Sequence, residues 1–111
     1  MARASGWDRD TRRDFPYAAY PRLGFLVPVR REGDVLARLM VRIEEVRESI
    51  SMVKQCLDHL GEGELRIEVP APEGFGLGLV EAPRGELMHC AHFRSGAIER
   101  YKVRDPSFCN W

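Results

Sequence analysis

The stretch GDVLARLMVRIEEVRESISMVKQCLDHL (33–60) carries the strongest periodic pattern in the sequence. Its apolar residues recur at alternating steps of three and four, which predicts a long α-helix with one continuous apolar seam. Asp34 is a suitable N-cap because its carboxylate can accept the unpaired N–H groups of the first turn, and Gly61 is a suitable C′ residue. We therefore predict a helix over 34–60 that is roughly 40 Å long. The seam residues are Leu36, Leu39, Ile43, Val46, Ile50, Val53, Leu57 and Leu60.

Further apolar side chains widen this stripe beyond the narrow seam of an isolated coiled coil. We therefore expect the helix to pack within a bundle or beneath a sheet. Its Met and Cys residues are interpreted as core rather than as reactive groups. The widening residues are Val35, Met40, Met52 and Cys56.

The second half of the chain, residues 64–104, is predicted to form strands. Residues 64–69 alternate polar and apolar side chains, as a half-buried strand does. Pro83-Arg84-Gly85 and Ser95-Gly96 then interrupt an otherwise strand-like sequence, which favours an antiparallel hairpin with one extra strand. These later strands are expected over 77–82, 86–93 and 97–103.

The N-terminal residues are less regular. Residues 1–22 show no sustained period and are predicted to form an irregular arm. Residues 23–29 are predicted to form a brief edge strand, because Pro28 lacks the N–H that a central strand requires. Together these elements predict an α+β fold in one domain, 1–111, with the long amphipathic helix packed on a small, mainly antiparallel sheet.

The charge balance argues against several classes of function. Lys plus Arg and Asp plus Glu both total 17 in 111 residues, so no net positive charge attracts a nucleic acid or an anionic lipid surface. No window approaches the roughly 20 consecutive apolar residues of a spanning helix, so any membrane link is expected to run through partner subunits. A cluster of opposite charges near the N-terminus is interpreted as solvated and self-neutralising. Its members are Asp8, Arg9, Asp10, Arg12, Arg13 and Asp14.

The three cysteines form no CxxC pair, which argues against a disulfide framework or a zinc ribbon and favours a reducing cytoplasm. Cys90 and His92 would share one face of a strand, and Cys109 could complete a metal site with them. A Cys-His nucleophilic pair is a second chemical interpretation, although two side chains on one strand face lie parallel to each other. Cysteine packed as a small hydrophobe explains the same residues without chemistry.

Two segments near the C-terminus give a sharper signal, EAPRGELMH (81–89) and RDPSFCNW (104–111). In the first, the proline removes a ladder donor and the glycine permits close backbone approach, so the Arg84 guanidinium can be aimed into a pocket. In the second, the Ser107 hydroxyl follows a proline and can donate to an anionic acceptor. A surface hairpin with a salt-bridging arginine and a turn serine is the alternative interpretation.

These residues resemble the large subunit of nickel-iron hydrogenases of the membrane-associated, formate-hydrogenlyase type. In that family an EAPRG stretch is followed by a histidine and later by a Pro-Ser or Pro-Thr step. The resemblance implies that Pro83 and Arg84 line the pocket over the bimetallic centre, with Arg84 in a catalytic role that assists proton handling. It also implies that Ser107 hydrogen-bonds a cyanide ligand on iron and that His89 is a supporting residue nearby.

Upstream, RASGWDRDTRRDFPYAAY (3–20) and GDVLARLMVRIEEVRESI (33–50) resemble the wider family that also contains the quinone-site subunit of complex I. Complex I subunits typically carry Lys at the position of Arg84 and lack the Pro-Ser-Phe-x-Asn-Trp ending. They also insert a His-containing helix where this chain has only the connector 61–78. The hydrogenase branch therefore fits better, and a complex I-like quinone oxidoreductase subunit without nickel is the alternative.

The resemblance implies an internal piece of a longer oxidoreductase subunit. The family's metal thiolates come from CxxC pairs near both ends of the subunit, and this chain contains neither. It is therefore expected to hold no metal and to be inactive alone. The implied partners are an iron-sulfur small subunit and membrane subunits, on the cytoplasmic face of the membrane. An unpartnered seam and sheet edges predict self-association, and a non-catalytic assembly module that binds a partner helix is a further alternative.

Overall fold

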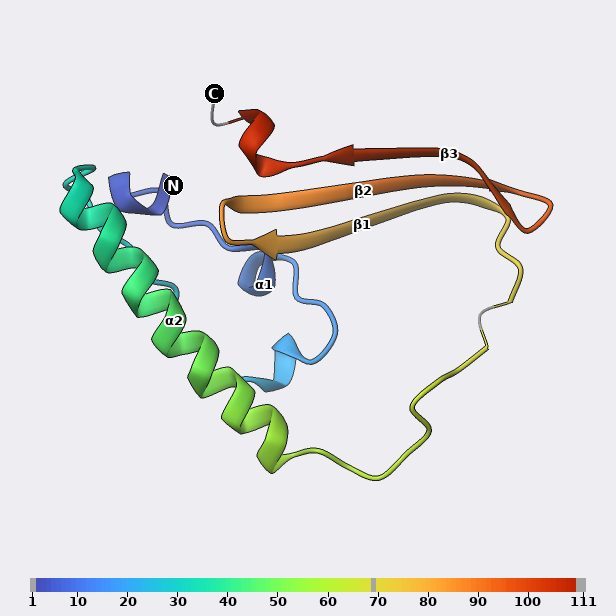
Figure 1. The fold of residues 1–111 in the computed structure, drawn as a ribbon, viewed down its shortest axis with the longest axis horizontal. Helices are drawn as coiled ribbons and strands as arrows, with labels where there is room; N and C mark the ends of the chain where they lie inside the picture. Colours follow the sequence, from blue (N-terminus) through green and yellow to red (C-terminus); the bar gives the residue numbers. More distant parts are fainter. Residues whose placement is uncertain (1, 69, 110–111) are drawn as a thin grey trace. The chain divides into compact units, whose positions relative to one another are not determined.

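The computed structural model describes residues 2–68 and 70–109, without the side chain of Cys109. The chain forms two compact units, Met1–Leu60 and Gly61–Trp111, where the sequence pattern predicted one domain. The first unit contains a long helix and the second a three-stranded antiparallel sheet (Figure 1), so the predicted α+β class is confirmed. These elements are α2 (Val35–Asp58), β1 (Gly74–Ala82), β2 (Gly85–Arg94) and β3 (Ala97–Arg104).

Helix α2 begins as predicted and ends earlier. The Asp34 side chain accepts a hydrogen bond of 2.7 Å from the backbone N–H of Ala37, which caps the first turn. At the other end the helix stops at Asp58, and His59 is the C-cap, with its N–H directed to the carbonyl oxygens of the last turn. The prediction that Gly61 terminates the helix is therefore wrong.

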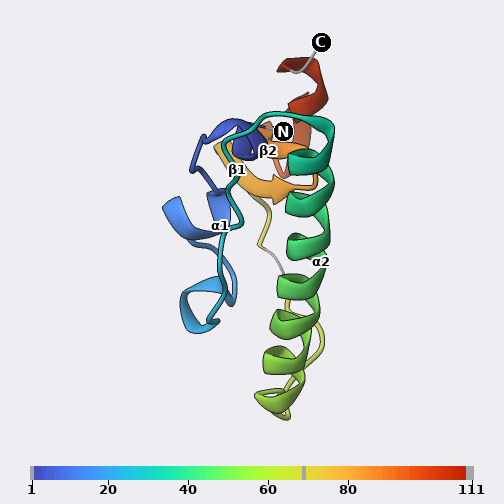
Figure 2. The same cartoon turned by 90° about the vertical axis from the view of Figure 1, so that its left-hand side faces the viewer.

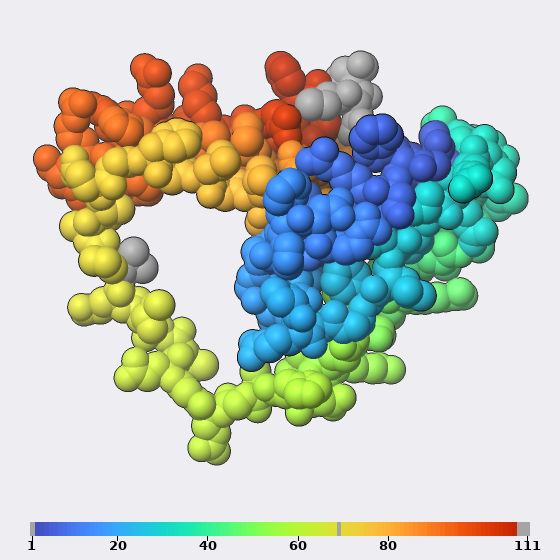
Figure 3. Space-filling view, turned by 180° about the vertical axis from the view of Figure 1, so that it is seen from behind, coloured from blue at the N-terminus to red at the C-terminus, as the bar shows by residue number. Residues whose placement is uncertain are grey.

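The N-terminal arm contains three short helical turns, so it is more regular than expected. They are η1 (Ala2–Ser5), α1 (Thr11–Asp14) and η2 (Tyr20–Arg22). The space-filling view in Figure 3 shows this arm, in blue, lying against the cyan and green turns of α2. A small apolar core of Ala4, Ala37 and Val41 joins η1 to the helix.

The segment after the arm is extended, but the edge strand predicted over 23–29 is wrong. Side chains of α2 take the hydrogen bonds that a neighbouring strand would have made. The amide of Gln55 accepts from the Gly24 N–H at 2.8 Å and donates to the Gly24 carbonyl at 2.7 Å, and Glu48 accepts from the Leu26 N–H at 3.0 Å. Figure 2 shows this segment running alongside the helix.

The face of α2 that is covered is not the predicted seam. All eight seam residues, from Leu36 to Leu60, are between 37% and 79% exposed, whereas Ala37, Val41 and Met52 on the opposite face are buried. The expectation that the seam is covered is therefore wrong for the part of the chain described, as is the assignment of Cys56 to the core, because Cys56 is exposed.

In the second unit, two short turns fix the register of the sheet. Ala82 pairs with Gly85 across Pro83 and Arg84, and Arg94 pairs with Ala97 across Ser95 and Gly96. Ser95 and Gly96 have φ angles of +52° and +75°, as a hairpin turn that follows the strand twist requires. The strand predicted over 64–69 is absent from 64–68, and Val69 lies outside the described residues.

Candidate functional site

The β1–β2 turn and the segment after β3 meet at one end of the sheet. Pro83 and Arg84 occupy the turn and are exposed, and Gly85 follows with a φ of +127°. A Cβ atom placed on Gly85 would lie 3.6 Å from the Cβ of Pro106, the first residue of η3 (Pro106–Cys109). The structure therefore brings the two segments together at the break between β1 and β2.

Asp105 is the residue that connects the two segments. It accepts a 2.8 Å hydrogen bond from the Ser107 N–H and a second one from the Ser107 hydroxyl. These two bonds hold the pKa of Asp105 below its ordinary value against the opposing effect of desolvation, and the positive charge of Arg84 makes a smaller contribution in the same direction as the bonds. Arg84 and Ser107 therefore act on the same carboxylate.

Asp105 was missed in the sequence, although a signal was present. An Asp two residues before a Ser, with a Pro between them, is typical of a turn in which the carboxylate accepts local N–H and O–H donors. In the structure the Ser107 hydroxyl donates to Asp105. Donation from Ser107 to a bound anion would therefore require this hydroxyl to change its partner.

His89 lies in the middle of β2, opposite Gly78 on β1 and Val103 on β3. Its Nδ1 contacts the hydroxyl of Tyr101, and the two rings are 5.7 Å apart. This contact fixes the imidazole on the sheet. The role of His89 as a supporting residue stays a prediction.

Cys90 and His92 lie two positions apart on β2 and so share one face of the strand, as predicted, but each has its own surroundings. Cys90 is half-buried and lies opposite Lys102. His92 Nδ1 is 2.6 Å from a carboxylate oxygen of Glu99, which also accepts from Arg94 at 2.8 Å. Glu99 is the extra residue at a bulge between β2 and β3, so the bulge turns its carboxylate toward His92.

The described residues do not fit a metal centre. Among residues 2–68 and 70–108, no group of three or more His, Cys, Asp or Glu side chains is arranged to hold a metal ion. Nickel in a soft site requires several thiolates, and each unit contains one cysteine whose side chain is described, Cys56 and Cys90. We therefore assign no metal-holding role, and no reaction step through a metal, to the described residues.

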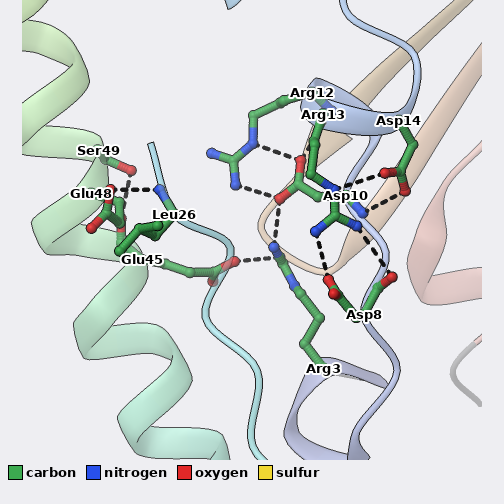
Figure 4. A network of polar contacts seen from close by, with 10 residues as sticks. All are labelled: Arg3, Asp8, Asp10, Arg12, Arg13, Asp14, Leu26, Glu45, Glu48 and Ser49. Carbon is green, nitrogen blue, oxygen red and sulfur yellow. Dashed lines mark hydrogen bonds and ion pairs between the residues drawn. The ribbon is translucent and has the colours of Figure 1, made fainter. Parts of the chain in front are cut away.

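A second polar cluster lies in the first unit, around Asp10 (Figure 4). Asp10 is fully buried and accepts hydrogen bonds from the guanidinium of Arg3 at 2.6 Å and from that of Arg12 at 2.6 and 2.9 Å. Arg3 also pairs with Glu45 of α2, so the cluster ties the arm to the helix. Burial alone would raise the pKa of Asp10, but the hydrogen bonds and charge of Arg12, with the charge of Arg3, lower it.

The interpretation of the N-terminal charges as a solvated segment is therefore wrong in part. Arg13 pairs with Asp8 at 2.7 Å and with Asp14 at 2.9 Å at exposed positions, as expected for solvated charges. Asp10 and Arg12, by contrast, form a structural ion cluster. Alternating charges alone do not reveal which member the fold will bury.

The chain belongs to the family of the respiratory-chain NADH dehydrogenase 49 Kd subunit, whose pattern matches residues 1–71. It is 38% identical to an NADH-quinone oxidoreductase subunit of Rhizobium etli (strain CIAT 652), over 97% of this chain and 34% of that protein. It is 39% identical to a carbon monoxide-induced hydrogenase of Rhodospirillum rubrum, over 100% of this chain and 32% of that protein.

A solved structure shares the fold. It is that of the membrane-bound sulfane sulfur reductase, an archaeal respiratory membrane complex, one chain of which matches with a TM-score of 0.84 and 32% identity. The match covers 95% of this chain and 31% of that chain. The chain thus spans about a third of the length of the relatives it matches. Among its described residues, no helix is long and apolar enough to cross a membrane.

Proposed function

We propose that this chain is part of the large subunit of a membrane-associated, hydrogenase-type oxidoreductase complex, in which the β1–β2 turn and η3 form one wall of the pocket over the reactive centre. The observation that supports the proposal is the close approach of Gly85 to Pro106, which brings the turn that carries Arg84 to the segment in which Asp105 holds Ser107. A guanidinium at such a turn can bind an anionic or polar group, and the Ser107 hydroxyl could join it after leaving Asp105.

In this proposal each residue has a distinct task. Arg84 supplies a permanent positive charge at the mouth of the pocket and assists proton handling there, and Pro83 keeps the turn rigid beside it. Asp105 orients the Ser107 hydroxyl. His89 supports the sheet that carries the β1–β2 turn through its contact with Tyr101. The nickel-iron centre, when present in a complete subunit, supplies the hydrogen chemistry, and its ligands come from outside this chain.

The proposed partners follow from the relatives. An iron-sulfur small subunit would carry electrons to or from the centre, and membrane subunits would hold the complex at the cytoplasmic face. The membrane complex whose chain shares this fold supports the coarser proposal that this chain belongs to a membrane complex with partner subunits. The isolated chain is proposed to be inactive because the metal ligands lie elsewhere.

A second candidate is a complex I-like subunit, in which the same fold helps to form a quinone site without nickel. The family pattern over residues 1–71 and the similarity to the NADH-quinone oxidoreductase subunit of Rhizobium etli favour it. The Arg at position 84 and the Pro106-Ser107 step favour the hydrogenase type instead.

The test uses the complete parent complex. Replacing Arg84 by Lys keeps the charge but removes the planar donor fork, so hydrogen turnover is expected to fall about a hundred-fold while nickel content stays unchanged. Arg100→Lys, on exposed β3, is the matched control and should leave turnover intact. A parent complex that contains no nickel and reduces quinone would establish the second candidate. Unchanged turnover in Arg84→Lys would remove Arg84 from the mechanism.

A further inference from the structure

Strands β2 and β3 stop pairing before they reach the turn that carries Arg84. Their last paired residues are Met88 and Arg104, and the same register, if continued, would place Glu86 opposite Pro106. Proline has no backbone N–H, so it cannot supply the hydrogen bond that would extend the pairing. The backbone hydrogen bonds between these two strands therefore do not hold the residues next to the turn.

An ion pair continues the connection beyond this point. The guanidinium of Arg104 donates to a carboxylate oxygen of Glu86 at 2.5 Å, diagonally across the two strands. The Glu86 side chain is only 19% exposed, whereas the Glu99 side chain, which pairs with Arg94 at the other end of the sheet, is 41% exposed. An ion pair with a less exposed carboxylate is less screened by solvent and so holds its two strands more firmly.

Gly85 separates this ion pair from Arg84. Its φ of +127° lies in a region that glycine reaches without strain, but glycine also leaves the backbone free to adopt other conformations. The two residues of the turn, Pro83 and Arg84, are exposed. A turn followed by a glycine keeps one position only where the chain beyond the glycine is held. Glu86 is the first residue beyond it, so the contact made by Glu86 can decide where Arg84 lies.

We propose that Arg104 is a positioning residue for Arg84. By holding Glu86, Arg104 keeps the neighbouring Gly85 against Pro106. The Arg84 guanidinium then stays beside the segment that follows β3. This inference rests on the function proposed above, in which Arg84 acts in a pocket, and it gives Arg104 an effect through Arg84 rather than on the bound group.

The two arginines should differ in the substitutions that they tolerate. The ion pair with Glu86 requires a positive charge within reach of the carboxylate, which Lys also supplies. Arg84, in the proposed function, requires the planar donor fork that Lys lacks. Arg104→Lys should therefore keep the turn in place, and Arg104→Gln, which removes the charge, should release it. Glu86→Gln removes the same ion pair from the other side and should match Arg104→Gln.

The first measurement follows the position of the turn in the 111-residue chain. A nuclear Overhauser cross-peak is expected between the Gly85 Hα and Pro106 Hβ protons, because these residues lie in contact. Arg104→Gln should abolish this cross-peak, and Arg104→Lys should retain it. The matched control, Arg94→Gln, breaks the ion pair at the other end of the sheet and should also retain it. The amide signals of the paired residues of β1 and β2 check that the sheet is folded in every variant.

The second measurement is the turnover of the complete parent complex. Arg104→Gln should lower turnover about ten-fold while nickel content stays unchanged, because a small displacement of Arg84 is enough to weaken its action. Arg104→Lys and Arg94→Gln should leave turnover unchanged.

A Gly85–Pro106 cross-peak that persists in Arg104→Gln and in Glu86→Gln would overturn the proposal. So would unchanged turnover in Arg104→Gln when Arg84→Lys loses turnover, or an equal loss of turnover in Arg104→Lys and Arg104→Gln. A lost cross-peak with unchanged turnover in both Arg104→Gln and Arg84→Lys would support the control of the turn by Arg104 and overturn the function proposed for Arg84.

Discussion

Gly85 lies directly against Pro106, with only 3.6 Å between the position of a Cβ on Gly85 and the Cβ of Pro106. This approach joins the β1–β2 turn to the segment that follows β3. It depends on a glycine at a φ of +127°, a conformation that other residues adopt only at a cost. The position of Arg84 relative to Asp105 and Ser107 is therefore set by the backbone.

Replacing Gly85 by Ala should destabilise the second unit by about 1–3 kcal/mol, because an L side chain is strained at this φ. Gly78→Ala is the matched control in the neighbouring strand, where an added Cβ meets nothing within 4 Å and no positive φ is required. It should change stability by less than about 0.5 kcal/mol. Urea unfolding followed by circular dichroism measures the change in stability of both variants. Equal losses in Gly85→Ala and Gly78→Ala would show that the turn is not constrained.

The titration of Asp105 tests the link to Ser107. The pKa of Asp105 should lie below 3.8 in the wild-type chain and rise toward that value in Ser107→Ala, because the variant loses the largest cause of the shift. Since the folded-state pKa is lowered, the contribution of Asp105 to stability is present above pH 3.8 and is lost as pH falls through the folded pKa. Carboxyl carbon NMR follows the titration. An Asp105 signal that is unchanged in Ser107→Ala would contradict the hydrogen bonds described.

The buried carboxylate of Asp10 should be far more important for stability than its exposed neighbour. Asp10→Asn removes the charge that Arg3 and Arg12 share, so we expect a loss of about 3 kcal/mol. Asp8→Asn breaks only an exposed pair with Arg13 and should cost less than about 1 kcal/mol. Thermal unfolding of each variant, followed by the circular dichroism of α2, distinguishes the loss of stability in Asp10→Asn from that in Asp8→Asn. Similar losses would mean that the Asp10 cluster contributes no more than a surface ion pair.

The side chain of Gln55 should control the order of the extended segment. In Gln55→Glu the carboxylate can still accept from the Gly24 N–H but cannot donate to its carbonyl, so about 1 kcal/mol should be lost. Gln55→Leu removes both bonds and should also speed the hydrogen exchange of the Gly24 amide. Lys54→Leu, at the adjacent exposed position, is the control. Unchanged exchange in Gln55→Leu would show that other contacts hold the segment.

Local patterns predicted the parts of this fold that local chemistry decides. The heptad spacing and Asp34 gave helix α2 and its first residue, because both act within one or two turns. Ser95-Gly96 and the break at Pro83 gave the hairpins, because turn geometry is set by the residues in the turn. The end of α2 was predicted less well, because helix ends depend on which of several nearby groups caps them.

Other features depend on contacts between residues distant in the chain. Residues 23–29 have the composition of a strand, but whether they pair in a sheet depends on a neighbouring strand, and the neighbour here is the polar face of α2. In the same way, Asp105 could be seen as a turn residue in the sequence, while its proximity to Arg84 required the sheet register that brings the β1–β2 turn to the end of β3.

The sequence by itself therefore determined the α+β class, the long helix, the three antiparallel strands and the two segments that form the candidate site. Only the tertiary structure decided which face of α2 is covered, that Asp10 is buried, and that Gly85 lies against Pro106. The physical reason is the distance along the chain over which each effect acts. Periodicity, capping and turn preference act over a few residues, whereas burial and charge pairing depend on which distant segments the fold brings into contact.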